Sequence, residues 1–255
     1  MAGDFVLEVC VDSLHGALEA QQGGAGRLEL CGNLEVGGVT ASYGLMKLVK
    51  RHIHIPVHAL IRPRGGDFVY SELEIEVMKA DIGVVGELGF QGVAIGALTP
   101  DREVDVGAMR VLLRECGRFS LDVTFHRAFD CVVAPLEALE VIAGLGGVSR
   151  VLTSGQEASA VEGVALLRGL VERRSVGVLP GAGVSDVNAR FLVEELLVSE
   201  LHGSVRKELR ASPLQDLLPG DKSSVIWTVD AEKVQRIVEV CKGTLLECEK
   251  GSEEA

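Results

Sequence analysis

The sequence predicts a single-domain α/β protein, a (β/α)₈ barrel of the TIM type. Apolar runs of strand length alternate with amphipathic stretches, the pattern of a parallel sheet covered by helices. Eight such runs fit within the 255 residues, and no linker divides them. Hydrophobic residues make up 47% but aromatic residues only 4%, so Val, Leu, Ile and Ala must build the core, as they do in parallel strands.

The predicted elements follow one another in strict alternation. Strands are expected near 5–11, 27–31, 56–61, 92–97, 122–125, 150–153, 175–179 and 200–202. Helices are expected near 13–22, 42–51, 71–88, 105–116, 135–145, 159–172 and 185–196. Ser71 and Glu74 form a capping-box pattern, and Pro135 suits a first helical turn. An irregular stretch near 210–224, a terminal helix near 229–241 and a frayed tail over 242–255 complete the single domain.

An open dinucleotide-binding sheet is the main alternative, but it would carry GxGxxG after its first strand. The sequence there reads VDSLHG over 11–16, which favours the closed barrel, and no organic cofactor is predicted.

Composition excludes several classes of partner. The net charge of −12 argues against binding to nucleic acid or to an anionic membrane. No run of 18 apolar residues predicts a transmembrane helix, and the start of the chain does not resemble a signal peptide, so a cytoplasmic location is expected. The six cysteines form no CxxC pair and are expected to be reduced thiols.

Charged residues occur at positions that face the barrel interior. Active sites of such barrels lie at the carboxyl ends of the strands, and side chains alternate between the lumen and the helices. This alternation directs Glu8, Glu29, Arg62 and His126 inward, and they are the candidate catalytic residues. The alternative is structural, with Glu8 or Glu29 paired to Arg62 merely to neutralise a polar core.

Cys10 and Cys31 are the candidate metal ligands. Both end neighbouring strands on the lumen side, and neighbouring strands lie about 4.8 Å apart. Two thiolates at that spacing could share one soft ion, and thiolates select Cu(I). The alternative is that both are small buried hydrophobic residues, which is common for free cysteine.

A ligand-binding or anion-binding set is predicted from the loops at the same end. Many barrels bind phosphate after the seventh and eighth strands through backbone N–H groups, although glycine there also serves tight turns. The candidates after these strands and after the third strand are Gly181, Gly183, His202, Ser204, Arg64 and Asp67.

Several longer motifs resemble the CutC family of copper homeostasis proteins and run in the family's order over roughly residues 5–205. They read LEVC at 7–10, RLELC at 27–31, GGVT at 37–40, IRPRGGDF at 61–68, TFHRAFD at 124–130 and RVLTSG at 150–155. The resemblance implies a (β/α)₈ barrel, a cytosolic location, a homo-oligomer (dimer or tetramer) and a role in copper handling. One departure follows the eighth strand, where the family's His-x-Ser-Ala is replaced by HGSV at 202–205.

Two functions follow from these residues. The first is a copper homeostasis protein that binds Cu(I) through Cys10 and Cys31 at the barrel mouth. The second is an enzyme acting on a small polar or phosphorylated metabolite, in which Arg62 clamps an anion and a carboxylate or His126 moves a proton. Whether the protein is an enzyme stays open, because a fold does not decide between them.

Overall fold

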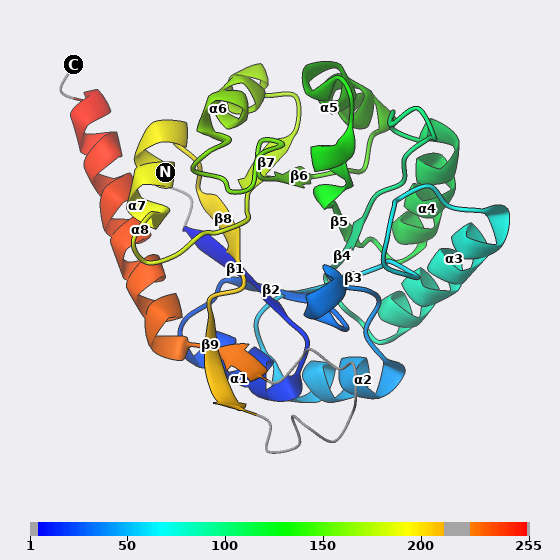
Figure 1. The fold of residues 1–255 in the computed structure, drawn as a ribbon, viewed down its shortest axis with the longest axis horizontal. Helices are drawn as coiled ribbons and strands as arrows, with labels where there is room; N and C mark the ends of the chain where they lie inside the picture. The colour runs from blue at the N-terminus through cyan, green and yellow to red at the C-terminus, as the bar shows by residue number, and fades with distance from the viewer. Residues whose placement is uncertain (1–4, 212–224, 254–255) are drawn as a thin grey trace.

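Eight parallel strands form a barrel in the computed structural model, which describes residues 5–211 and 225–253 (Figure 1). The strands pair in the order β7-β6-β5-β4-β3-β2-β1-β8, and β7 contacts β8 across the seam. Their bounds are β1 Val6–Val11, β2 Arg27–Leu30, β3 Val57–Leu60, β4 Gly92–Ile95, β5 Asp122–Phe125, β6 Arg150–Thr153, β7 Gly177–Pro180 and β8 Glu200–Gly203. The predicted barrel is therefore confirmed.

A ring of helices covers the outside of the barrel (Figure 1). They are α1 Leu14–Gln22, α2 Tyr43–His52, α3 Glu72–Glu87, α4 Val106–Arg118, α5 Pro135–Leu145, α6 Val164–Arg173 and α7 Ala189–Leu196, with short 3₁₀ turns η1 Leu34–Val36 and η2 Arg127–Cys131. Ser71 and Glu74 form the predicted capping box, and Pro135 occupies the first turn of α5.

Helices α6 and α7 begin several residues later than the sequence pattern indicated. The segments before them form loops that bond to each other, since Ala160 N donates to the carbonyl of Ala182 at 3.0 Å. Asn188 Oδ1 also accepts from Ser185 N at 2.9 Å. These loops lie at the carboxyl end of the barrel, where they help to form its mouth.

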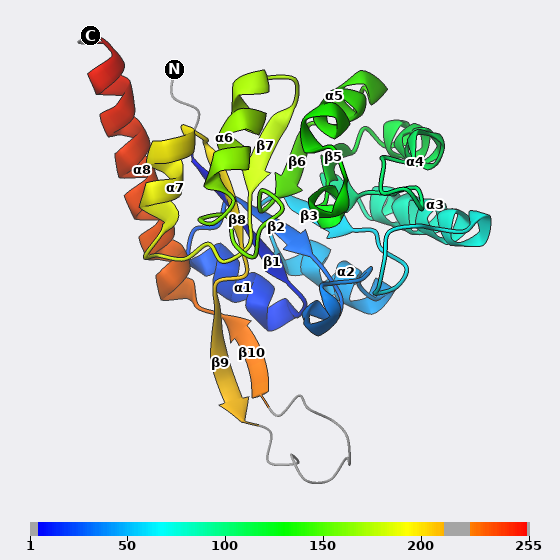
Figure 2. The same ribbon diagram turned by 45° about the horizontal axis from the view of Figure 1, so that its top comes forward.

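The chain after β8 differs most from expectation. Strands β9 (Arg206–Ala211) and β10 (Val225–Val229) pair antiparallel as a hairpin that projects from the barrel (Figure 2). The sequence analysis assigned an irregular stretch near 210–224; its first two residues end β9, and 212–224 lie outside the described residues. The hairpin was missed because β9 consists mainly of charged residues rather than an apolar run.

Helix α8 (Ala231–Glu253) takes the place of the eighth outer helix and packs on α7 and α1 (Figure 1). It continues well past 241, through much of the segment expected to be frayed. Val234, Ile237, Val238 and Cys241 are buried at helical spacing, and Thr244 with the partly buried Leu245 continues this face beyond the predicted end. Among the described residues, no helix combines the length and hydrophobicity that a membrane crossing needs.

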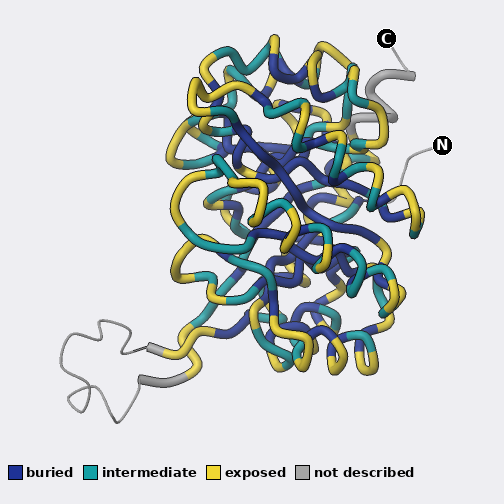
Figure 3. The backbone as a smooth tube through the Cα atoms, turned by 90° about the vertical axis from the view of Figure 1, so that its right-hand side faces the viewer, coloured by how far each residue is buried: buried dark blue, intermediate teal, exposed yellow. Residues whose placement is uncertain are grey.

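The core lies mainly between the strands and the helix ring, and Figure 3 shows the buried strands crossing the middle of the molecule. Apolar residues such as Leu7 and Val9 face the helices, while the intervening residues face a polar lumen. Small residues of β4 leave room in that lumen. A Cβ at Gly92 would lie 2.6 Å from His58 Nε2, so glycine there allows the imidazole to lie inside the barrel.

Candidate metal and ligand site

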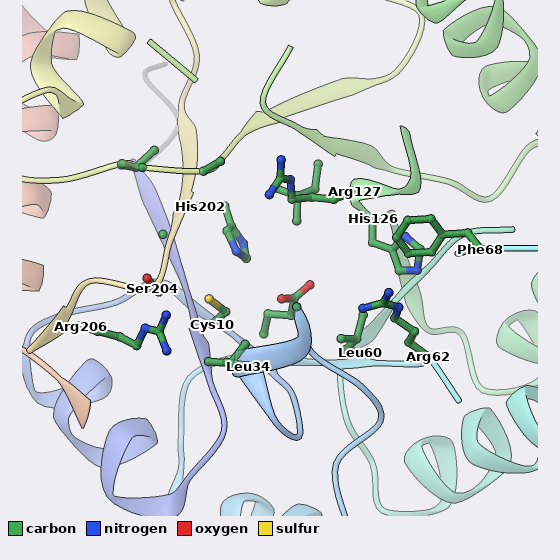
Figure 4. Close-up of a pocket in the computed structure, with 17 residues that line it drawn as sticks. Cys10, Leu34, Leu60, Arg62, Phe68, His126, Arg127, His202, Ser204 and Arg206 are labelled. Carbon is green, nitrogen blue, oxygen red and sulfur yellow. The ribbon is translucent and has the colours of Figure 1, made fainter. Parts of the chain in front are cut away.

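A cavity of about 240 Å³ opens at the carboxyl ends of the strands (Figure 4). Side chains from β1, β2, β3, β6 and β8 line it together with the segments that follow β2, β3, β5, β7 and β8. Its apolar wall is formed by Leu34, Leu60, Phe68, Leu152 and Val184. Its polar groups are Cys10, Glu29, Arg62, His126, Arg127, His202, Ser204 and Arg206.

Three potential metal ligands meet on one side of this cavity. The sulfur of Cys10, a carboxylate oxygen of Glu29 and a ring nitrogen of His202 all lie within 4.8 Å of one another, and all three residues are buried. The strand register explains the meeting, because Cys10 is opposite Glu29 on β2 and β8 adjoins β1 from the other side. A thiol, a carboxylate and an imidazole at this spacing could coordinate one metal ion.

Glu8 holds His202 from below rather than entering the cavity. Its Oε1 lies 2.7 Å from Nδ1 of His202, and its other oxygen accepts a hydrogen bond from Arg27. With Nδ1 bonded to Glu8, the Nε2 atom of His202 is the one available to a metal ion. Glu8 therefore orients a cavity residue, although the sequence analysis grouped it with the candidate catalytic residues.

The acid–base properties of the cluster follow from burial and close contacts. Burial would raise the pKa of Glu8, but the hydrogen bond from His202 and the charge of Arg27 hold it well below its usual value. Burial would lower the pKa of His202, yet Cys10, Glu8 and Glu29 raise it well above its usual value. The pKa of Glu29 is raised by burial and by the neighbouring Glu8, against the opposing effect of His202.

Cys31 lies beside this cluster but does not line the cavity. It is buried, and its Sγ lies 3.4 Å from Oε2 of Glu29. Burial and the adjacent Glu29 raise the pKa of the Cys31 thiol well above its usual value. Cys10 and Cys31 belong to one buried cluster with Leu60 and Ala94, but the register places Glu29 opposite Cys10 and puts Cys31 two residues further on, so the group of potential ligands at the mouth contains Cys10 and not Cys31.

Arg62 occupies the opposite side of the cavity (Figure 4). Its guanidinium donates to the backbone carbonyls of Val36, Gly38 and Gly66 and lies 4.7 Å from the centre of the Phe68 ring. The alternative in which Glu8 or Glu29 pairs with Arg62 is wrong in its partner. Arg27 neutralises Glu8 instead, because Arg27 lies directly opposite Glu8 on the neighbouring strand β2, whereas Arg62 follows β3.

His126 lies next to Arg62, also against Phe68, with ring centroids 5.0 Å apart. Its Nδ1 accepts from the backbone N–H of Ala128 at 3.2 Å, so the proton of the neutral ring is on Nε2. Burial and the charge of Arg62 lower the pKa of His126 to about 3, which keeps the ring neutral.

The predicted anion-binding residues divide into two groups. Gly183, His202 and Ser204 line the cavity, and Gly181 lies behind it, where a Cβ would come within 3.3 Å of the His202 side chain. Arg64 and Asp67 are not brought to the cavity. They pair with each other at 3.0 Å, and Arg64 also bonds Glu74 at 2.5 Å, which ties the loop after β3 to the start of α3.

A second set of charges fills the amino end of the lumen. Arg27 Nη2 lies 2.6 Å from Glu200, which lies 3.2 Å from Arg150, which in turn lies 2.7 Å from Asp122. Each of these four residues begins its strand, so they form one layer beneath the mouth. None of the four was predicted, although the alternation that selected Glu29 places Arg27 on the lumen side, and Glu200 shares the parity of His202.

Arg127 and Arg206 were also missed at the cavity rim. Arg127 directly follows His126 and begins η2, and Arg206 begins β9. Arg127 is fixed by Asp130 at 2.7 Å and by Ser154 at 3.1 Å. Their positions in the TFHRAFD motif and after the eighth strand were the available signal.

Comparisons with known proteins agree on one family. Residues 5–207 match the model of the CutC family. The chain is 47% identical to a human protein named "Copper homeostasis protein cutC homolog" over 80% of this chain and 75% of the relative. It is also 47% identical to a family protein CutC of Xylella fastidiosa over 91% and 87% of the two chains. A crystal structure of CutC from Streptococcus agalactiae superimposes with a TM-score of 0.74 at 32% identity, covering 78% and 98%.

Proposed function

Because this chain belongs to the CutC family, we propose that it is a copper homeostasis protein that binds Cu(I) at the barrel mouth, with Cys10 as the central ligand. The observation that carries the proposal is the buried cluster of Cys10, Glu29 and His202, whose ligand atoms lie within 4.8 Å of one another. A relative that is nearly half identical bears a copper homeostasis name, which favours copper as the ion.

The chemistry of the donors supports this choice. A thiolate is a soft ligand that selects Cu(I), and imidazole also suits copper. Glu8 accepts the Nδ1–H of His202, which fixes the ring and leaves Nε2 for the metal, as carboxylates commonly do behind metal-binding histidines. Metal binding at this cluster should release protons, because a thiolate and an unprotonated imidazole nitrogen are the ligand forms.

Cys31 is the proposed second thiolate. Its sulfur is already 3.4 Å from Glu29, a member of the cluster, so a side-chain rotation rather than a backbone movement would bring it toward the ion. Glu29 would then give up its contact with the Cys31 thiol. In this arrangement the thiolates of Cys10 and Cys31 and the imidazole of His202 coordinate the ion, and the carboxylate of Glu29 does not.

The test is Cu(I) titration under reducing conditions. We expect Cys10→Ser to abolish tight binding, and Cys31→Ser and His202→Gln to weaken it by roughly 10–100-fold, the range for perturbed metal sites. Cys131→Ser is the matched control, because Cys131 is an exposed thiol outside the cavity and should leave the stoichiometry unchanged.

Equal Cu(I) binding by the wild type and by Cys10→Ser would reject the proposed site. A parallel titration with Zn²⁺ tests the identity of the ion. Binding of Zn²⁺ more tightly than Cu(I) would argue against copper as the cargo and favour the enzyme hypothesis, since three protein ligands beside an open cavity are typical of catalytic zinc.

A further inference from the structure

The cavity is lined by more basic than acidic side chains, although the protein as a whole is acidic. The whole chain has a net charge of −12, yet the lining includes Arg62, Arg127 and Arg206 against the single carboxylate of Glu29. Arg127 and Arg206 have acidic partners, Asp130 and Glu35, at 2.7 and 3.4 Å. A concave site lined by one sign of charge concentrates small ions of the other sign.

Arg62 is the exception among these arginines, because no carboxylate in the described residues pairs with it. It is only 6% exposed, and its guanidinium is held by three backbone carbonyls and the face of Phe68. Carbonyl oxygens accept from both terminal nitrogens of the guanidinium, but its Nε has no hydrogen-bond partner in the described residues and no carboxylate compensates its charge. A buried charge without a counter-charge is costly, so the neighbouring cavity is the natural place for an anion.

His126 adds an unused hydrogen-bond donor beside this charge. Its Nε2 is buried and has no partner in the described residues, while its Nδ1 is occupied by Ala128. Phe68 brings the two residues together, since the imidazole and the guanidinium both lie against its ring (Figure 4). Buried polar groups nearly always have a partner, so a free donor at a cavity wall points to a ligand atom that accepts.

The loop after β7 supplies further donors on another wall. Ala182, Gly183 and Val184 line the cavity, and their backbone N–H groups bond to no acceptor in the described residues. Ala182 and Gly183 both have positive φ, 75° and 70°, so the loop takes an unusual conformation that an alanine does not favour. Consecutive free amides of this kind bind oxyanions in many proteins.

We propose that the cavity binds a small organic anion through its phosphate or carboxylate oxygens, held by the charge of Arg62, the Nε2–H of His126 and the amides of the 182–184 loop. This site uses other residues than the copper cluster does and goes beyond metal binding. The apolar wall of Leu34, Leu60, Phe68 and Leu152 would contact the carbon part of the ligand. On this proposal the mouth binds an organic anion as well as a metal ion.

The experiment uses metal-free full-length protein kept in chelator, so that failure of copper binding cannot affect the result. Inorganic phosphate and malonate are titrated separately by calorimetry and by thermal melting at constant ionic strength. We expect saturable binding of at least one of them with a raised melting temperature, and the stronger of the two identifies the anionic group. Absence of saturable binding by both would overturn the proposal.

Two variants locate the site. His126→Asn keeps an oxygen for the Ala128 N–H, as asparagine is a favoured N-cap residue, but removes the Nε2 donor. We expect about tenfold weaker binding, the effect of losing one hydrogen bond to a charged group. Arg62→Gln should weaken binding further. Since Arg62→Gln also frees three loop carbonyls, His126→Asn decides the question if the arginine variant fails to fold.

Arg64→Gln is the matched control. This arginine lies in the same loop as Arg62 but outside the cavity, paired with Asp67 and Glu74. It should bind both anions as the wild type does. Anion binding that His126→Asn leaves unchanged, or that Arg64→Gln abolishes, would place the anion elsewhere and refute the site.

Discussion

The two ends of the barrel lumen treat their buried charges differently. At the amino end, Arg27, Glu200, Arg150 and Asp122 form a continuous chain of ion pairs, each opposite charge within 3.2 Å of the next. At the carboxyl end, Arg62 has no carboxylate partner in the described residues and the Nε2 of His126 has no partner at all there. Both ends are polar, but the arginines of the amino end are paired with carboxylates, whereas Arg62 at the carboxyl end is not.

This difference separates structural charges from binding charges within one core. A buried ion pair whose hydrogen bonds are complete has nothing left to offer a ligand, and removing one member leaves the other unpaired. A buried donor without an acceptor lowers stability until a ligand supplies one. The position of Glu8 marks the boundary, because it bonds Arg27 on one side and His202 on the other.

The sharpest way to break this comparison is Arg27→Ala. It removes the cation shared by the buried Glu8 and the half-buried Glu200, which keep only His202 and Arg150 as partners, so we expect a loss of about 3 kcal/mol in the free energy of unfolding. Urea denaturation measures the change. Arg64→Gln, which removes a half-exposed arginine paired with Asp67 and Glu74, should cost no more than about 1 kcal/mol. Comparable losses in both variants would contradict the structural role of the amino-end layer.

A smaller effect is expected from pH at the open end. The pKa of His126 is about 3 in the folded protein, against about 6.5 in the unfolded chain. Between these values the unfolded chain binds a proton that the folded protein does not, so stability falls as the pH is lowered through this window. His126→Asn should flatten the fall, by up to about 1.4 kcal/mol per pH unit.

Chemical denaturation at a series of pH values between 4 and 7 measures this slope. His58, with a pKa of about 4, adds a fall of the same sign and remains in both proteins, so only the difference between them reports on His126. Identical slopes would mean that His126 is already protonated in the folded protein, and would remove it as a neutral donor.

The smallest expected effect comes from Gly181→Ala. The added Cβ would lie 2.7 Å from Cδ1 of Leu152, a flexible side-chain end, and 3.3 Å from the His202 side chain. Stability should therefore fall by no more than about 1 kcal/mol, within the usual range for point substitutions. Copper affinity should fall as well, because His202 must shift. Unchanged affinity with a displaced His202 would argue against that residue as a ligand.

Much of the fold could be predicted because apolar strand runs and helix caps are local signals. The eight strands, the capping box of Ser71 and Glu74 and the helix start at Pro135 all appear near their expected places. The hairpin of β9 and β10 was not predicted, since its pairing joins segments separated in the chain and β9 consists mainly of charged residues, although the run VIWTV of β10 is typical of a strand. The extension of α8 depends on tertiary packing against α7 and α1.

The site could be predicted only as far as side-chain alternation reaches. Alternation directed Cys10 and Glu29 inward, and His202 was expected among the anion-binding residues at the same end, but alternation carries no information on register between strands. Register decides that Cys10 meets Glu29 instead of Cys31, and that Glu8 meets Arg27 instead of Arg62. The roles of Arg64 and Asp67 depended on loop conformation, which no periodicity specifies, so those residues were assigned to a cavity that they do not reach.

The hairpin gives the cavity an optical reporter. Trp227 on β10 is the only tryptophan in the chain and is 44% exposed. Arg206, which lines the cavity, stacks over its indole with 5.7 Å between the guanidinium carbon and the ring centre. A ligand that draws Arg206 inward would take a cation away from the excited indole, so its emission intensity should follow occupancy of the mouth without any added dye.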